Sequence, residues 1–186
     1  MQVGFSPIAN RGGDYGYPHV IVDEETLVEI VSRAKERIMR IGFIDYQMDN
    51  FHSNVYLQAI RGPLADRGFE VAACWSLDEG SGRAWGERNG VPYLADVPEI
   101  DRIVDCYAVL APSDPEVHLE LSRRVFPFGK PTYVDKTFAP SLADARAIFE
   151  LADTHGAAVQ TTSALRYTEV QDYMERIKRS EVLHMV

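Results

Sequence analysis

Residues 129–136 read GKPTYVDK. This stretch places a short buried strand, residues 132–134, directly before an acid and a lysine. Ligands of open α/β sheets bind in the crevice beyond the carboxyl ends of the strands. The sequence therefore predicts that Lys136 lies at such a strand end, where it faces a ligand.

Strands and helices alternate along most of the chain. Apolar runs predict strands at residues 41–45, 69–75, 92–94, 103–110, 132–134 and 157–161, and amphipathic segments predict helices at 54–67, 81–89, 115–125 and 141–155. Apolar strands between amphipathic helices are typical of a parallel sheet covered on both faces. Because crossovers between parallel strands are right-handed, the predicted fold is α/β, a Rossmann-like doubly wound parallel sheet with helices on both faces.

The chain divides into three predicted parts. Residues 1–38 form an N-terminal extension, a loop followed by a helix that begins near Asp23. Residues 39–165 form the Rossmann-type nucleotide-binding domain. Residues 166–186 hold a further helix at 169–179 and the beginning of a strand at 181–186, and we expect them to be the truncated start of a second α/β domain.

Composition excludes some function classes. The formal net charge of −9 argues against a nucleic-acid-binding surface, which is normally basic. No apolar run approaches the roughly 20 residues of a membrane-spanning helix, and no secretory signal is visible, so we expect a cytoplasmic protein. Cys74 and Cys106 lie in apolar strands, where pairing is an alternative, but free thiols are favoured in a reducing compartment.

Several motifs, in chain order, resemble those of the Gfo/Idh/MocA family of NAD(P)-dependent oxidoreductases. Residues 39–44 look like the first strand of that family, and residues 129–136 are similar to its signature G-K-P-V-x-x-E-K-P, which residues 141–145 continue. Residues 111–113, with His118, resemble its loop after the fourth strand. Residues 163–167 resemble the segment that leads into its second domain.

The resemblance implies a nicotinamide cofactor, NAD or NADP, bound by the Rossmann domain, and a second α/β domain that supplies most of the substrate pocket. It implies that Lys136 is catalytic and assists hydride transfer to or from a secondary alcohol of a sugar- or polyol-like substrate. The cofactor-binding residues that it implies are Asp45, Ser76, Ala111, Pro112, Ser113, His118 and Asp135. We expect a small-molecule substrate, no nucleic acid or membrane partner, and self-association into a homo-oligomer through the uncovered apolar face.

Two features depart from that family. The turn after the first strand, residues 44–52, contains no glycine, whereas a dinucleotide fingerprint needs glycines there so that the backbone can approach the pyrophosphate. Asp45 and Asp49 in this turn would repel phosphate. The second strand ends in Ser76 instead of an acid for the ribose hydroxyls, with Arg83 near enough to meet a 2′-phosphate. These departures favour an alternative function, a non-catalytic interaction or regulatory domain with a degenerate cofactor site.

Two further alternatives remain open at this point. Asp45, Asp49 and His52 offer oxygen and imidazole ligands on one loop, which is a weak indication of a metal-assisted enzyme. Residues 17–27 resemble the beginning of the last helix of the family's enzymes, so residues 1–38 are either an extension or a displaced piece of a permuted chain.

Overall fold

The computed structural model describes residues 38–163 and 168–169. The helix predicted near Asp23 and the strand predicted at 181–186 lie outside the described residues, as does all of the helix predicted at 169–179 except its first position. Within the described part of the chain, no helix is long and apolar enough to cross a membrane. Cys74 and Cys106 are both free thiols, as predicted.

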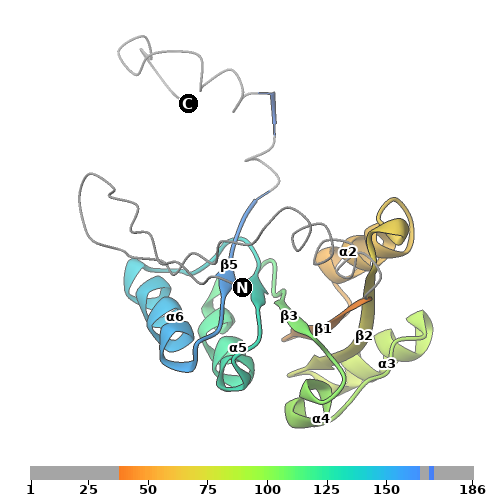
Figure 1. Ribbon diagram of the computed structural model, residues 1–186, viewed down its shortest axis with the longest axis horizontal. Coiled ribbons are helices and arrows are strands. Elements are labelled where there is room, and N and C mark those ends of the chain that lie inside the picture. Colours follow the sequence, from red (N-terminus) through yellow and green to blue (C-terminus); the bar gives the residue numbers. More distant parts are fainter. Residues whose placement is uncertain (1–37, 164–167, 170–186) are drawn as a thin grey trace, which may run out of the picture. The chain divides into compact units, whose positions relative to one another are not determined.

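A five-stranded parallel sheet forms the centre of the described domain (Figure 1). Its strands are β1 (Met39–Asp45), β2 (Phe69–Ser76), β3 (Cys106–Val109), β4 (Thr132–Val134) and β5 (Val159–Gln160). Their order across the sheet is β2-β1-β3-β4-β5, and every neighbouring pair is parallel. The direction of winding reverses between β1 and β3, which makes this the topological switch point of the sheet. The predicted Rossmann-like fold class is confirmed.

Two predicted strands differ in the structure. The strand predicted at 92–94 is reduced to a single parallel bridge between Cys74 and Tyr93, beside β2. Pro92 has no N–H with which to extend a ladder. The strand predicted from Ile103 begins only at Cys106, because the N–H groups of Ile103 and Val104 donate to Ile100 O and close a short helix, α4 (Val97–Asp101), that the sequence pattern did not predict.

The first crossover helix, α2 (Phe51–Arg61), begins three residues before its predicted start. Asn50 caps it, because its side chain accepts hydrogen bonds from the N–H groups of His52 and Ser53. The helix ends at Gly62, before Pro63, and the rest of the predicted helix is a separate 3₁₀ turn, Ala65–Arg67. The shifted start matters for the site, because it makes His52 part of the first helical turn.

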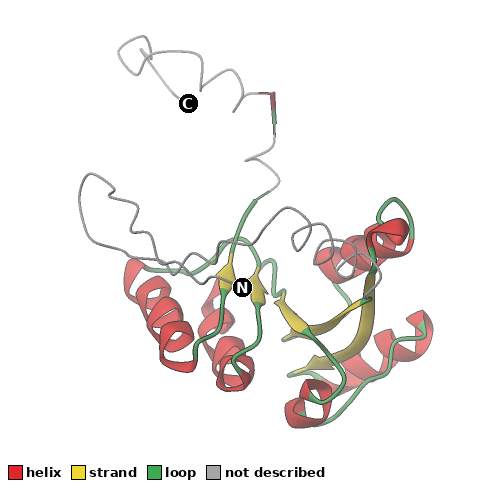
Figure 2. Cartoon of the chain, viewed as in Figure 1, coloured by secondary structure: helices red, strands yellow, loops and turns green. Residues whose placement is uncertain are grey.

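The remaining helices follow the predicted pattern more closely. They are α3 (Glu79–Asn89), α5 (His118–Val125) and α6 (Leu142–His155). Ser141 caps α6 and Gly156 ends it in the left-handed conformation, as predicted. The Pro at the start of the helix predicted at 115–125 lies in a 3₁₀ turn, Pro115–Val117, which leads directly into α5. Helices and strands therefore alternate along the chain (Figure 2).

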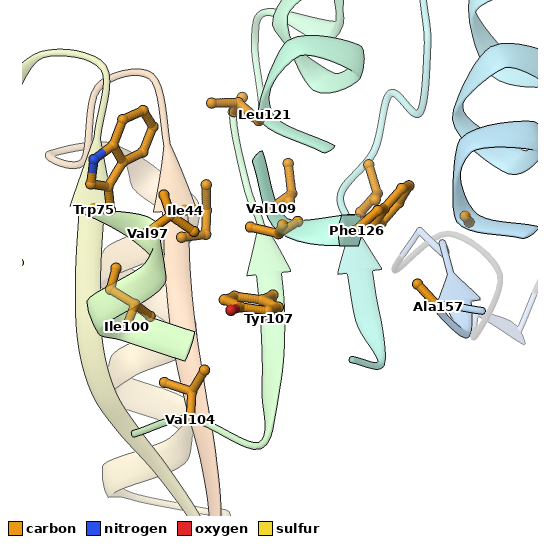
Figure 3. Packing of buried hydrophobic residues seen from close by; sticks show 14 of the residues in the cluster. Ile44, Trp75, Val97, Ile100, Val104, Tyr107, Val109, Leu121, Phe126 and Ala157 are labelled. Carbon is orange, nitrogen blue, oxygen red and sulfur yellow. The ribbon is translucent and has the colours of Figure 1, made fainter. Parts of the chain in front are cut away.

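Each face of the sheet has its own hydrophobic core. Adjacent strand residues point to opposite faces, so Ile44 belongs to one core and Phe43 to the other. Helices α4, α5 and α6 cover the first core, whose residues include Ile44, Trp75, Val97, Ile100, Val104, Tyr107, Val109, Leu121, Phe126 and Ala157 (Figure 3). Helices α2 and α3 contribute Leu57 and Trp85 to the second. Helices thus lie on both faces, and ligands of such sheets bind at the carboxyl ends of the strands.

Candidate functional site

The carboxyl ends of β1, β3 and β4 lie level with one another. Ile44 pairs with Val109, and Val109 pairs with Val134, at the ends of the three strands. The next residues, Asp45, which ends β1, and Leu110 and Asp135, which follow β3 and β4, therefore lie at the same height. This arrangement brings together Asp45, Ala111, Pro112, Ser113, Asp135 and Lys136, all of which the sequence predicted as site residues. Ser113 is exposed, whereas Ala111 and Pro112 are buried.

Asp135 is the centre of a polar cluster at this edge. Its side chain is fully buried. Its Oδ1 atom accepts hydrogen bonds from the Tyr133 hydroxyl at 3.0 Å, the Tyr56 hydroxyl at 3.2 Å and the Lys136 N–H at 2.8 Å. Its Oδ2 atom pairs with Nδ1 of His52. Because both oxygens act as acceptors, this carboxylate ties α2, β4 and the loop that follows β4 to one point.

The two tyrosines of this cluster remain hydrogen-bond donors at neutral pH. Burial raises the pKa of Tyr133, and the neighbouring Tyr56 and Asp135 raise it further. Burial also raises the pKa of Tyr56. A protonated hydroxyl beside a buried carboxylate is the stable arrangement, since ionising it would place two negative charges together.

The cluster around Asp135 was not predicted from the sequence, in which His52 is a candidate metal ligand only and neither Tyr56 nor Tyr133 is a candidate site residue. Asn50 was the residue from which this cluster could have been predicted, because Asn is favoured at helix N-caps. A helix that begins after Asn50 includes both His52 and Tyr56, and residues four apart lie on the same helix face.

Lys136 extends from the end of β4 toward the loop that follows β3. Its Nζ atom donates to Pro112 O at 3.3 Å, and its peptide bond with Thr137 is cis. Within residues 38–163 its ammonium group has no ion-pair partner, unlike Lys130, which pairs with Asp101. The lysine thus lies just beyond the carboxyl end of β4, the position that the sequence predicted, and its ammonium group contacts the loop after β3.

His118 and Ser76 bond to the main chain. His118 is fully buried, with Nε2 at 2.8 Å from Leu110 O and Nδ1 at 3.0 Å from Phe138 O. Its ring therefore joins the end of β3 to the loop that carries Lys136. Ser76 is buried and donates from Oγ to Tyr46 O at 3.0 Å. Both residues lie at the predicted edge, where they hold loops in place.

The turn after β1 is closed by its own side chains. The buried carboxylate of Asp45 accepts hydrogen bonds from the N–H groups of Tyr46 at 2.7 Å and Gln47 at 3.3 Å, and from Nδ2 of Asn50 at 2.6 Å. Asn50 Oδ1 in turn accepts from the first N–H groups of α2. Burial raises the pKa of Asp45, although these hydrogen bonds oppose the shift. The backbone donors that a helix N-terminus offers to a phosphate are therefore already bonded.

Two further charged groups near this turn, Asp49 and Arg83, are ion-paired. Asp49 pairs with Arg88 at 2.7 Å, and Arg83 pairs with Glu79 at 2.6 Å and lies over the Tyr93 ring. Asp45, Asp49 and His52 thus bind three different partners. Among the residues that the structure describes, no three His, Cys, Asp or Glu side chains come together to hold a metal ion, so the geometry does not support the metal interpretation.

An apolar cavity of about 790 Å³ lies on the α2 side of the sheet. Its lining includes Phe43, Ile60, Ala108, Val159, Tyr56 and Tyr133. It contacts the Asp135 cluster only through the two tyrosines. Most of its lining lies along the middle and the amino ends of the strands, so this cavity is distinct from the carboxyl-end edge of the sheet, where Lys136 lies.

Comparison with protein families decides how this site is interpreted. The model of an oxidoreductase family with an NAD-binding Rossmann fold matches residues 16–163. The chain belongs to the Gfo/Idh/MocA oxidoreductases. The predicted family is confirmed, and with it NAD or NADP as the cofactor that the family's Rossmann domain binds. A comparison with curated protein sequences found no match.

Solved structures share the fold at low sequence identity. The WlbA dehydrogenase from Bordetella pertussis, in complex with NADH and UDP-GlcNAcA, is 16% identical with a TM-score of 0.62, and the match covers 75% of this chain and 42% of that one. Biliverdin reductase from Synechocystis sp. PCC 6803, in complex with biliverdin and NADP+, is 14% identical with a TM-score of 0.58, covering 74% and 42%. GenD2 from gentamicin A biosynthesis, in complex with NAD, is 18% identical with a TM-score of 0.61, covering 77% and 40%. The matched region spans about two fifths of these proteins.

The loops at the carboxyl ends of β3 and β4 and the turn after β1 differ in how well they fit a nicotinamide dinucleotide. At the ends of β3 and β4, the exposed Ser113 and the ammonium group of Lys136 fit a polar ligand that carries negative charge. At the β1–α2 turn the fit fails, because the Asp45 carboxylate already takes the N–H groups that would hold a diphosphate. We therefore derive no diphosphate contact at that turn.

Proposed function

We propose that the described domain is the cofactor-binding part of an NAD(P)-dependent oxidoreductase that acts on a secondary alcohol of a sugar- or polyol-like substrate. The observation that carries this proposal is Lys136 at the carboxyl end of β4, whose N–H group donates to the buried carboxylate of Asp135 and whose Nζ atom donates to Pro112 O in the loop after β3. Family membership supports the reaction class. The nucleotide-sugar compound in the WlbA complex supports the substrate class.

In this proposal, the residues at the carboxyl ends of β3 and β4 have separate roles in catalysis and cofactor binding. When bound, the nicotinamide ring accepts or supplies the hydride. Lys136 donates a hydrogen bond to the substrate oxygen and stabilises the negative charge that develops there. Asp135 orients Lys136 through its N–H group. Ala111, Pro112 and Ser113 border the cofactor, and His118 holds the loop of Lys136 against the end of β3.

A second candidate function follows from the closed β1–α2 turn. In this Rossmann fold, the N–H groups that would bind a phosphate already donate to the Asp45 carboxylate. Such a domain is suited to a non-catalytic role in interaction or regulation. The two functions differ in whether the chain binds a nicotinamide cofactor. In either case, we propose a cytoplasmic protein with free thiols at Cys74 and Cys106 that associates with copies of itself.

Hydrogen exchange with and without NADH tests where a cofactor binds. We expect protection of residues 111–114 and 135–138, the loops after β3 and β4, because a bound nucleotide excludes water from the carboxyl ends of these strands. The amide groups around the apolar cavity, such as those of Ala59 and Ile60, serve as an internal control and should exchange at an unchanged rate. Protection confined to the cavity, or none at saturating NADH, would contradict the proposed function.

A further inference from the structure

We infer that Asp45 closes the anion site of the β1–α2 turn, and that removing its carboxylate strengthens the binding of ligands that contain a diphosphate. The inference rests on the proposed function, since it concerns how the same crevice takes a dinucleotide. It assigns to Asp45 a role opposite to that of a cofactor-contacting residue: this side chain lowers the affinity of the wild-type domain for the diphosphate.

The hydrogen bonds of Asp45 carry the argument. The N–H groups of Tyr46 and Gln47, together with Nδ2 of Asn50, converge on one buried carboxylate. Several N–H donors that converge at the end of a first strand, beside a helix N-terminus, are the donor set that holds a dinucleotide diphosphate in Rossmann domains. A carboxylate and a phosphate are both anionic acceptors, so the two groups compete for these donors.

The carboxylate cannot simply move aside. Asp45 ends β1, its main-chain oxygen accepts from the Leu77 N–H at 3.1 Å, and its side chain is fully buried. The turn that follows is held by Ser76 Oγ and by the N–H group of Asp78, both of which donate to Tyr46 O. A displaced carboxylate would remain buried without its donors, which is costly for a charged group.

Asp45 is also the uncompensated charge of this turn. Within the described residues it makes no ion pair, whereas Asp49, four residues later, pairs with Arg88. A diphosphate bound at this turn would therefore be repelled by the charge of Asp45, which no cation among the described residues neutralises. Asp49 offers a matched comparison, because it lies in the same turn and carries the same charge, but it is exposed and accepts no bond from the Tyr46 or Gln47 N–H groups.

The test compares ligand binding by wild type, Asp45→Gly, Asp45→Ser and the control Asp49→Asn, measured by calorimetry. The probes are NADH, ADP-ribose, which contains the diphosphate, and adenosine, which does not. Asp45→Gly removes the shared acceptor of the Tyr46, Gln47 and Asn50 donors, and Asp45→Ser removes the charge while keeping a small polar side chain. Circular dichroism spectra establish that each variant is folded. If Asp45→Gly does not fold, the comparison with wild type relies on Asp45→Ser.

We expect both Asp45 variants to bind ADP-ribose at least about tenfold more tightly than wild type, because new charge-assisted hydrogen bonds replace a repulsive contact. Their affinity for adenosine should match that of wild type, and Asp49→Asn should change the affinity for ADP-ribose by less than about threefold. Equal or weaker binding of ADP-ribose by both Asp45 variants would overturn the inference.

The inference and the proposed function fail in different ways. If wild type binds NADH but the Asp45 variants bind ADP-ribose no more tightly, the inference alone is wrong. If the variants bind ADP-ribose while wild type binds neither ligand, the inference holds and the wild-type domain does not use the cofactor. If no protein binds either ligand, both are wrong.

Discussion

Replacing Asp135 by Ala is expected to lower the free energy of unfolding by at least about 3 kcal/mol. The substitution removes the acceptor shared by His52, Tyr56 and Tyr133, and leaves these donors without their partner in a partly buried site. It also frees the N–H group of Lys136. Chemical denaturation followed by circular dichroism measures the loss.

Asp153→Ala is a suitable control for the Asp135 prediction. Asp153 lies exposed in α6 and changes the net charge by the same amount when replaced. We expect its effect to stay within about 0.5 kcal/mol, as for most surface substitutions. A loss below about 1 kcal/mol for Asp135→Ala would show that the cluster around Asp135 does not stabilise this edge of the sheet.

Replacing Lys136 by Met is expected to lower the rate of hydride transfer by about 10²- to 10⁴-fold, the range attributed to a positioned proton donor or acceptor. Met keeps the length of the side chain and removes the ammonium group. The rate is measured from NAD(P)H absorbance in a protein that carries this domain together with its second domain, with the sugar or polyol that the wild-type form turns over best.

The affinity of Lys136→Met for NADH distinguishes a catalytic role of Lys136 from a structural one. Because Lys136 acts on the substrate oxygen in this account, the Kd for NADH should change by less than about tenfold, while the rate falls much further. Arg123→Met, which removes an exposed cation from α5, should leave the rate within about twofold of wild type. A Lys136→Met variant that keeps the wild-type rate would exclude the proposed role of Lys136.

Most of the sheet could be predicted from the sequence because its strands are apolar on both faces and its helices are amphipathic. The errors occurred where one local interaction outweighs the pattern. Pro92 limits the pairing of Tyr93 to one bridge, and Ile103 and Val104 close α4 instead of beginning β3. Asn50 starts α2 three residues early through its side-chain cap, an interaction to which hydrophobic periodicity is insensitive.

The candidate site was predictable only in part, for a similar reason. Lys136 and Ser113 follow apolar strands, and the carboxyl ends of parallel strands always lie at one edge, so their meeting could be expected. The position of His52 could not, because it depends on the exact start of α2. The role of Asp45 depends on where its carboxylate points. Its charge was visible in the sequence, but the bonds to Tyr46 and Gln47 are a property of the folded turn.

In a calorimetric titration of the chain with NADH, we expect saturable binding of one NADH per chain. The expected Kd lies between about 1 µM and 1 mM, the usual range for enzymes and their ligands. We also expect that ADP-ribose competes with NADH for the same site. No saturable binding of either NADH or NADPH below about 1 mM would contradict the account and identify the domain as a Rossmann fold that serves interaction or regulation without a cofactor.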